Sequence, residues 1–307
     1  MSTEDAEQLA LDGLAPRKRR KRAPAVKTPA AEHPIAQVVL DIQAIHLGQT
    51  FDYYVEEKYS EAAQPGVMVR VRFGGQRVNG IIWKRTDTSE TPESSLRFIE
   101  RVVIDRVLVS ESMRNDATLI ADAFGGTRAN ILRLAVPPRV ARVEQEQRIG
   151  NRTGIEKNGR IESLAKIERE SYEQLQRQYG NIDLLRTALE GQRFQAFVLD
   201  PLPGSHHWRQ CVAWMVSAAL LQGKPAVLVL PTMREIEDMA ETLQLIGLRC
   251  FAPTQSSNGA YGGDFAILNA QMAPAERYRA YLAISGGQVR CVIGTRAAMY
   301  APVDGNA

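Results

Sequence analysis

Hydrophobic and polar positions follow two different periods along this chain. Between residues 34 and 109, apolar side chains recur at every second position in short runs. The clearest run is 67–73, where valines and a phenylalanine alternate with Met68, Arg70 and Arg72. A period of two places the valines on the core face of a strand and the arginines on the opposite face. This period predicts a compact β domain, a small barrel or two packed sheets, with strands at 36–42, 50–55, 67–73, 77–84 and 97–109.

Helical patterns complete this first domain. Residues 111–124 are expected to form a helix that is capped by Ser110 or Ser112, because a serine hydroxyl can accept from the unpaired N–H groups of the first turn. The polar stretch 86–95 contains a proline and is expected to be a surface loop. Residues 130–136 then pack back before two consecutive prolines, so we place the domain at 34–143.

The last third of the chain alternates apolar runs of strand length with helical segments. The expected strands are 194–199, 226–230, 249–252, 266–268 and 289–293, and the expected helices are 208–221, 233–245 and 274–284. Continuous β-branched runs separated by helices are typical of a parallel sheet covered on both faces. The predicted fold class is therefore a multidomain α+β protein, in which a small β-rich domain is followed by an α/β lobe at 193–307.

Two segments are mainly polar. Residues 1–33 hold almost no large apolar side chain, so we expect a disordered tail that cannot offset the entropy of ordering. The tail contains six adjacent cations at 17–22, which would serve either as a phosphate-attracting arm or as a solubility tail. Residues 144–192 are expected to be a polar helical linker, with a reduced three-helix module as the alternative.

Composition excludes several classes of protein. The net charge of +3 is small, so composition alone does not indicate a nucleic-acid partner. Cys211, Cys250 and Cys291 lie far apart, which fits neither a tetrahedral zinc site nor a disulfide scaffold, and we expect them to be buried. With no apolar run near the roughly 20 residues that span a bilayer and no secretory signal, we expect a cytoplasmic protein.

The candidate chemistry of the β domain centres on Phe51, Asp52 and Tyr53. They place an aromatic pair around one carboxylate, shortly before a basic hairpin that ends at Gly74-Gly75. Such a group can hold the end of a nucleic-acid strand, because aromatic faces stack on bases of any sequence. The alternative is structural, with Asp52 capping a turn and both rings in the core.

The candidate chemistry of the α/β lobe would lie in the turn after its first expected strand, where phosphate binds in such folds. A working phosphate loop needs several glycines, backbone N–H donors, a lysine and a Ser or Thr for magnesium. This turn offers two prolines without N–H groups, and the next lysine is Lys224. Its remaining candidates form a degenerate nucleotide loop: Gly204, Ser205, His206 and His207. We expect no ATP with magnesium to bind there, and no metal at the two histidines.

Five groups of residues resemble one known family, the primosomal replication-restart protein PriA (primosomal protein N′). In the β domain they are the Phe51-Asp52-Tyr53 motif, the hairpin 66–75 and the string 134–137. In the lobe they are 222–231 and 293–299, which are similar to that family's helicase lobe. The resemblance covers residues 34–143 and 194–303, in the order of the family.

The resemblance implies a 3′-DNA-binding domain followed by an incomplete RecA-like helicase lobe. By analogy, Asp52 would accept a hydrogen bond from a terminal 3′-OH, Phe51 and Tyr53 would line the base and sugar pocket, and Gly74 would permit close approach of the backbone. Arg97 stands where the family usually has a lysine. The family binds DNA forks and 3′ single-stranded ends, works with other primosome proteins and single-strand-binding protein, and uses ATP, magnesium and zinc.

The departures from the family favour a member without helicase activity. The winged-helix module is reduced to the polar segment, the phosphate loop is degenerate, and no cofactor is expected in this chain. We therefore expect a nucleoid-associated DNA-binding protein of replication restart. Two alternatives remain open: an ATP-dependent 3′→5′ helicase whose C-terminal part is missing from this chain, and a protein-interaction scaffold that binds no DNA.

Overall fold

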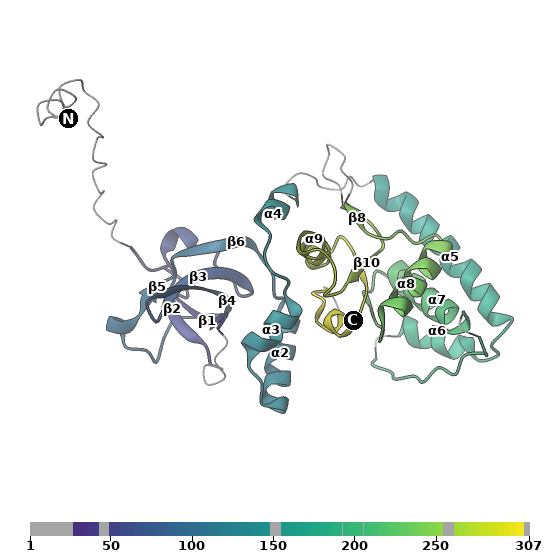
Figure 1. Ribbon diagram of the computed structural model, residues 1–307, viewed down its shortest axis with the longest axis horizontal. Helices are drawn as coiled ribbons and strands as arrows, with labels where there is room; N and C mark the ends of the chain where they lie inside the picture. Colours follow the sequence, from purple (N-terminus) through teal and green to yellow (C-terminus); the bar gives the residue numbers. More distant parts are fainter. Residues whose placement is uncertain are drawn as a thin grey trace, which may run out of the picture.

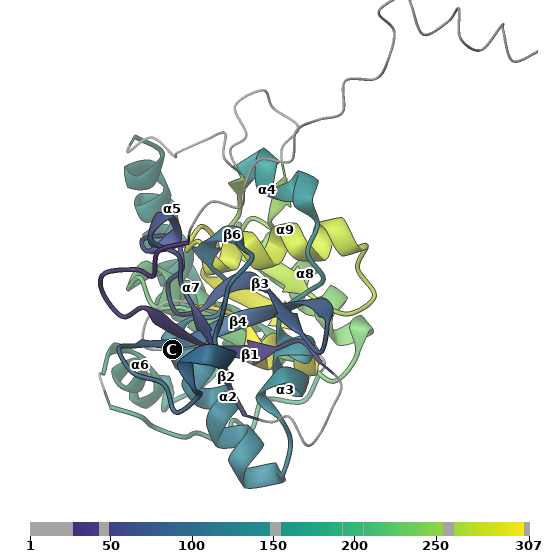
Figure 2. The ribbon, with the colours of Figure 1, turned by 90° about the vertical axis from the view of Figure 1, so that its left-hand side faces the viewer.

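The computed structural model describes residues 27–42, 49–147, 155–191, 193–204, 206–253 and 261–303. The predictions for the basic run 17–22 and for Ser205 lie outside the described residues. A β domain and an α/β lobe lie at opposite ends of the long axis, with short helices between them (Figure 1). Figure 2 looks onto the β domain from its own end of the molecule and shows its strands in front of the lobe.

The β domain is one six-stranded sheet in the order β5-β2-β1-β4-β3-β6. Its strands are β1 (Ile35–Leu40), β2 (Phe51–Tyr54), β3 (Val67–Phe73), β4 (Gln76–Thr86), β5 (Arg97–Phe98) and β6 (Arg101–Val107). Only residues 99 and 100 separate β5 from β6, yet β5 pairs with β2 at one edge and β6 pairs with β3 at the other. The sheet therefore curls into a barrel in which the single segment 97–107 lies along both edges.

Alternation along the strands fills this barrel as the sequence predicts. The inward-facing positions of β3, Val69 and Val71, are fully buried in one cluster with Val38 and Ile82 of the neighbouring strands. Gly80 on β4 lies directly under β1, since a Cβ there would be 2.5 Å from a Val38 methyl group. A glycine is needed at this position because the two strands approach so closely.

Three helices follow the barrel: α2 (Glu111–Phe124), α3 (Arg128–Ala135) and α4 (Ala141–Gln147). Of the two expected caps, Ser110 is the one used, since its Oγ accepts from the Met113 N–H at 3.3 Å. Met113 and Leu132 of these helices join a core with Ile104 and Leu108. The helices therefore cover one side of the barrel and extend its hydrophobic core.

The α/β lobe has a three-stranded parallel sheet in the order β10-β11-β7. Its elements are α7 (His207–Leu221), β7 (Ala226–Val229), α8 (Met233–Leu245), the short pair β8 (Ala252–Pro253) and β9 (Tyr261–Gly262), β10 (Phe265–Leu268), α9 (Pro274–Ser285), β11 (Cys291–Gly294) and the 3-10 turn η4 (Arg296–Tyr300). Helices α7 and α8 pack on the sheet face that carries Phe265 and Ile293. Helix α9 packs on the face that carries Ala266 and Val292. The predicted parallel sheet with both faces covered is confirmed.

Two expected strands of the lobe differ from the structure. Residues 194–199 form no strand, and Phe194 and Val198 are 94% and 99% exposed. A strand needs a neighbouring strand to satisfy its backbone N–H and C=O groups, and in the described part of the lobe no strand pairs with 194–199. Residues 249–252 contribute only a single bridge from Cys250 to Phe265 and the start of β8.

Residues 144–192, expected as a solvated linker, are largely incorporated into the lobe. They contain the end of α4, then α5 (Ile155–Gln176) and α6 (Ile182–Glu190). Leu164 and Ile167 of α5 share a core with α7 and α8, and the buried Trp214 indole N–H donates to Glu168 at 3.0 Å. Part of the expected tail is also packed, because Ala30 is buried and its N–H donates to the Val55 carbonyl.

Helix α9 joins the two parts of the molecule. Its Tyr278, Tyr281 and Leu282 are buried in the core cluster of the β6–α4 region. The Tyr281 hydroxyl donates to the Leu108 carbonyl at 2.7 Å, and the Tyr278 hydroxyl donates to Glu144 at 2.9 Å. Burial raises the pKa of both phenols, so both stay neutral at any physiological pH.

The three cysteines lie in or near the core of the lobe. Cys211 and Cys291 are buried and Cys250 is half-buried, and burial raises the pKa of all three thiols. None of the helices that the structure describes is both long and apolar enough to cross a bilayer.

Candidate nucleic-acid interface

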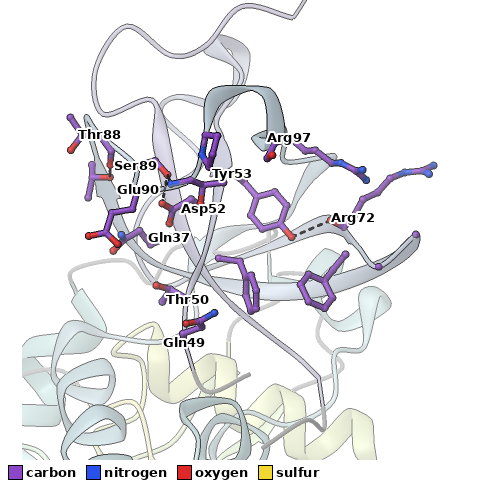
Figure 3. A pocket seen from close by; sticks show the side chains of 18 residues that line it. Gln37, Gln49, Thr50, Asp52, Tyr53, Arg72, Thr88, Ser89, Glu90 and Arg97 are labelled. Carbon is purple, nitrogen blue, oxygen red and sulfur yellow. Dashed lines mark hydrogen bonds between the residues drawn. The ribbon is translucent and has the colours of Figure 1, made fainter. Parts of the chain in front are cut away.

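A pocket of about 1070 Å³ opens at one end of the barrel. Its walls come from β2, from the end of β3, from the turn at Gly74 and Gly75, and from the loop 86–95 with Arg97 after it. Figure 3 shows that these side chains converge from segments far apart in the sequence. The pocket brings together all five residues predicted for DNA binding: Phe51, Asp52, Tyr53, Gly74 and Arg97.

Asp52 is held by the loop that follows β4. The Ser89 hydroxyl donates a short hydrogen bond to the Asp52 carboxylate, and the Thr91 N–H donates to Ser89 Oγ at 3.0 Å. In Figure 3, Thr88 and Glu90 both lie on the left-hand side of this contact, and both line the pocket. An ionised carboxylate has about four lone-pair positions, so Asp52 keeps room to accept from a second hydroxyl.

The two aromatic side chains next to Asp52 point to the other face of β2, since successive side chains of a strand alternate. Tyr53 is only 4% exposed, and its hydroxyl donates to the Arg72 carbonyl at 3.1 Å. Burial raises the pKa of Tyr53 to about 12, against a smaller opposing effect of Arg97. Phe51 is half-buried and meets the Phe73 ring edge-on, with 4.7 Å between centroids. The rings therefore build the wall of the pocket, and Phe51 offers the more accessible face.

The turn between β3 and β4 has two residues with positive φ, +55° at Gly74 and +82° at Gly75. These φ values are those of the two-residue hairpin turns that favour glycine. A Cβ on either residue would meet no other atom within 4 Å among the described residues. The backbone conformation requires the glycines, and the space beside them is open to a ligand.

Cations occupy the side of the pocket opposite Asp52. Arg97 pairs in register with Tyr53, and its side chain is exposed. Figure 3 shows the guanidinium groups of Arg97 and Arg72 extending to the same side, away from Asp52. The pocket thus has an acceptor at one end and positive charge at the other.

The residues that position Asp52 carry no recognisable sequence motif. Ser89 lies 37 residues from Asp52 in the chain, in a stretch expected only to be a surface loop. The hydroxyl-rich run 86–91 is the one local signal, and it does not identify a partner. Alternation on β3 correctly places Arg72 on the outer face of the strand. Its position beside the pocket depends on how the sheet curls, which alternation does not predict.

The degenerate nucleotide loop of the lobe precedes α7. Gly204 has a φ of +121°, and the rings of His206 and His207 lie with centroids 3.9 Å apart. The next lysine, Lys224, donates to the carbonyls of Leu189 and Gly191 at the end of α6. Lys224 therefore connects the segment after α7 to the C-terminal end of α6.

The fold and the pocket define a two-part protein, in which a barrel with a polar end pocket is joined through a buried helix to an α/β lobe. Residues 37–137 match the family model of the PriA 3′-DNA-binding domain (3′BD). Curated relatives include the probable replication restart protein PriA of Mycobacterium tuberculosis, 30% identical over 258 residues, and that of Mycobacterium leprae, 30% identical over 259 residues. Each alignment covers 84% of this chain.

These matches make the chain a PriA-like protein, and they confirm the resemblance seen in its motifs. The chain spans 35–36% of the length of these relatives. All five predicted DNA-binding residues lie inside the matched domain.

Proposed function

We propose that this protein binds DNA in replication restart and recognises the 3′ end of a strand at a stalled fork. The observation that carries the proposal is that the 3′-DNA-binding match spans the strands and loops of the Asp52 pocket. The terminal 3′-OH donates to Asp52, whose carboxylate is already oriented by Ser89. The base stacks on the accessible face of Phe51.

The charge distribution of the pocket supports this orientation of the strand. A phosphate at the Asp52 end would be repelled by the carboxylates of Asp52 and Glu90, which both line the pocket. A phosphate at the other end meets Arg97 and Arg72. A strand therefore fits with its hydroxyl end inward and its last phosphodiester at the arginines.

In this proposal the α/β lobe acts without ATP hydrolysis and holds no ATP, magnesium or zinc. Pro201 and Pro203 lack the N–H groups that a phosphate loop donates, and Lys224 is engaged elsewhere. The lobe instead offers a surface to other primosome proteins or to single-strand-binding protein. The exposed apolar side chains of Phe194 and Val198 support such a contact.

Fluorescence anisotropy with forked DNA tests the proposal. We expect a fork with a free 3′-OH to bind about tenfold or more tightly than the same fork with a 3′-phosphate, because a hydrogen bond to a charged group contributes about 1.5–3 kcal/mol. Asp52→Ala should remove this preference, and Asp105→Ala on the exposed part of β6 serves as the matched carboxylate control.

Two results would contradict the proposal. Equal affinity for hydroxyl and phosphate ends would refute recognition of the 3′ end. DNA-stimulated ATP hydrolysis by the purified chain would refute the non-catalytic role and favour the helicase alternative.

A further inference from the structure

A second group of cations lies on the outside of the barrel, beyond the pocket that holds Asp52. It surrounds a hollow of about 470 Å³ that is lined by Lys27, Arg70, Arg77, Glu100 and Arg101. Four of these five residues are basic. Nothing in the end-binding role described above uses them.

The strand register creates this group. Arg70 of β3 pairs directly with Arg101 of β6, and Arg72 of β3 pairs directly with Arg77 of β4. Val69 and Val71 point into the core, so the arginines between and beside them point outward. Successive outward positions on one strand are about 7 Å apart, so the cations form a row along the barrel.

Two cross-strand pairs of like charge are an unfavourable arrangement for the folded protein alone. One carboxylate relieves part of it: Glu100 lies 2.8 Å from Arg72 and 2.9 Å from Arg77, and hydrogen bonds from these arginines lower the pKa of Glu100. Among the described residues, Arg70 and Arg101 make no ion pair. The group therefore has positive charge left over for a polyanion.

The cations are also oriented for contact. The Arg70 Nε–H donates to the Asn79 side chain at 3.0 Å, which fixes the guanidinium and leaves its other N–H groups available. Arg101 is exposed, and Arg77 retains 64% of its side-chain exposure in spite of its ion pair. Guanidinium groups bind phosphate oxygens through paired N–H donors, so this surface fits a phosphodiester chain.

The row is continuous with the end pocket. Arg72 lines that pocket and is paired across the hairpin with Arg77. Figure 3 shows Arg72 and Arg97 extending from the pocket on the side away from Asp52. We name these residues the arginine track: Arg70, Arg72, Arg77, Arg97 and Arg101.

We propose that the arginine track binds the phosphodiester backbone of the same DNA strand whose 3′ end occupies the Asp52 pocket. This inference rests on the proposed function, because it takes the direction of the strand from the end pocket. The track adds affinity that depends on strand length and salt but not on base sequence. The end pocket adds the preference for a 3′-OH.

Anisotropy with single strands of increasing length separates these two contributions. We expect the wild-type protein to bind a longer 3′-OH oligonucleotide about tenfold or more tightly than a 3′-OH dinucleotide, since each added phosphate reaches another cation. The double variant Arg70→Gln/Arg101→Gln should bind the dinucleotide as the wild type does but lose most of the gain with length. Its salt slope for the longer strand should fall by about 1.4, for two lost single-strand phosphate contacts.

The matched control is Lys166→Gln/Arg169→Gln on the exposed face of α5, which removes the same charge far from the track. We expect this control to keep the wild-type gain with length and the wild-type salt slope. The single variant Arg101→Gln, at an exposed position, is a second test: the salt slope of its affinity for the longer strand should fall by about 0.7. Thermal unfolding of each variant confirms that the barrel is intact.

An unchanged gain with length in the Arg70→Gln/Arg101→Gln protein would refute the track, as would an equal loss in the α5 control. The ratio of affinities for 3′-OH and 3′-phosphate ends, measured in the same titrations, reports on the end pocket separately. If that ratio stays high while the track variant behaves as the wild type, only this inference fails. If the ratio is one in the wild type, the proposed function fails.

Discussion

Tyr53 offers a sharp test of how the pocket wall is built. Tyr53→Phe keeps the buried ring and removes one hydrogen bond, the 3.1 Å contact from its hydroxyl to the Arg72 carbonyl. That bond ties β2 to β3 across the end of the barrel. Its loss should lower the free energy of unfolding by about 1 kcal/mol, because the carbonyl of an exposed residue can take up water instead.

The difference in free energy of unfolding between the wild type and Tyr53→Phe should also depend on pH. Burial raises the pKa of Tyr53 to about 12 in the folded protein, against about 10 in an unfolded chain. The raised pKa means that the stabilising contribution of the neutral phenol is complete below pH 10 and is lost as pH rises to about 12. The loss amounts to about 2–3 kcal/mol, so the variant should become the more stable protein above about pH 11.

Equilibrium unfolding in urea measures both effects, followed by tryptophan fluorescence in a Trp208→Phe/Trp214→Phe background, in which Trp83 on β4 is the remaining tryptophan. At neutral pH the variant should unfold at a lower urea concentration, with a melting temperature lower by about 2–4 °C. Equal stability of the two proteins at neutral pH would refute the proposed tie between β2 and β3. Parallel stability curves between pH 10 and pH 12 would refute the burial of the phenol.

Three further substitutions test the packing of the molecule. Arg160→Met removes one of two arginines that pair with the buried Asp264, and Arg249 remains, so the lobe should lose about 1.5–3 kcal/mol in urea unfolding. Tyr281→Phe leaves the Leu108 carbonyl without its donor at the junction of the two parts, and calorimetry should show about 1–2 kcal/mol less stability. Gly80→Ala places a Cβ 2.5 Å from a valine methyl and 2.8 Å from a backbone carbonyl of β1, so thermal unfolding should show a loss of about 2–3 kcal/mol.

Matched changes control these predictions. Lys166→Met breaks an exposed ion pair on the same helix as Arg160 and should cost less than about 0.5 kcal/mol. Gly74→Ala meets no neighbouring atom and should cost only about 1 kcal/mol, for its positive φ. A loss at Gly74 as large as that at Gly80 would contradict the close approach of β1 and β4.

The barrel was the most predictable part of the fold. Strand β3 alternates fully between apolar and polar residues, and the two glycines after it mark the hairpin, so local sequence determines both elements. The closure of the sheet was not predictable, because it depends on one segment, 97–107, that pairs with both edges. Pairing between distant segments has no local signal.

The lobe differs from the prediction at 194–199 and at α5, again because the structure there depends on contacts between distant segments. Phe194 to Leu199 has the apolar run of a buried strand, but the structure provides no partner beside it, and the run is exposed. Conversely, the sparse apolar positions of α5 looked insufficient for a core. Leu164, Ile167 and Leu175 are buried because α7 supplies the rest of that core. Burial is a property of the assembled elements, not of one helix.

For the candidate site, the motif at 51–53 lies in the wall of the pocket, but the sequence does not determine the geometry around it. The sequence left open whether Tyr53 lies in the core or lines a pocket, and the structure shows that its ring is buried. No sequence signal identified Ser89 as the partner of Asp52. The arginine track follows from alternation on β3 together with the register of β4 and β6. The alternation on β3 can be predicted from the sequence, whereas the register of β4 and β6 cannot.

The most direct test of the central claim is a double perturbation of the contact between Asp52 and a terminal 3′-OH. Wild-type protein and Asp52→Asn, which is close in shape and can still accept from Ser89, are each titrated with oligonucleotides that end in 3′-OH or 3′-H. Recognition of the hydroxyl by Asp52 predicts a coupling free energy of about 1.5–3 kcal/mol between the two changes. Effects that add to within about 0.3 kcal/mol would contradict the account.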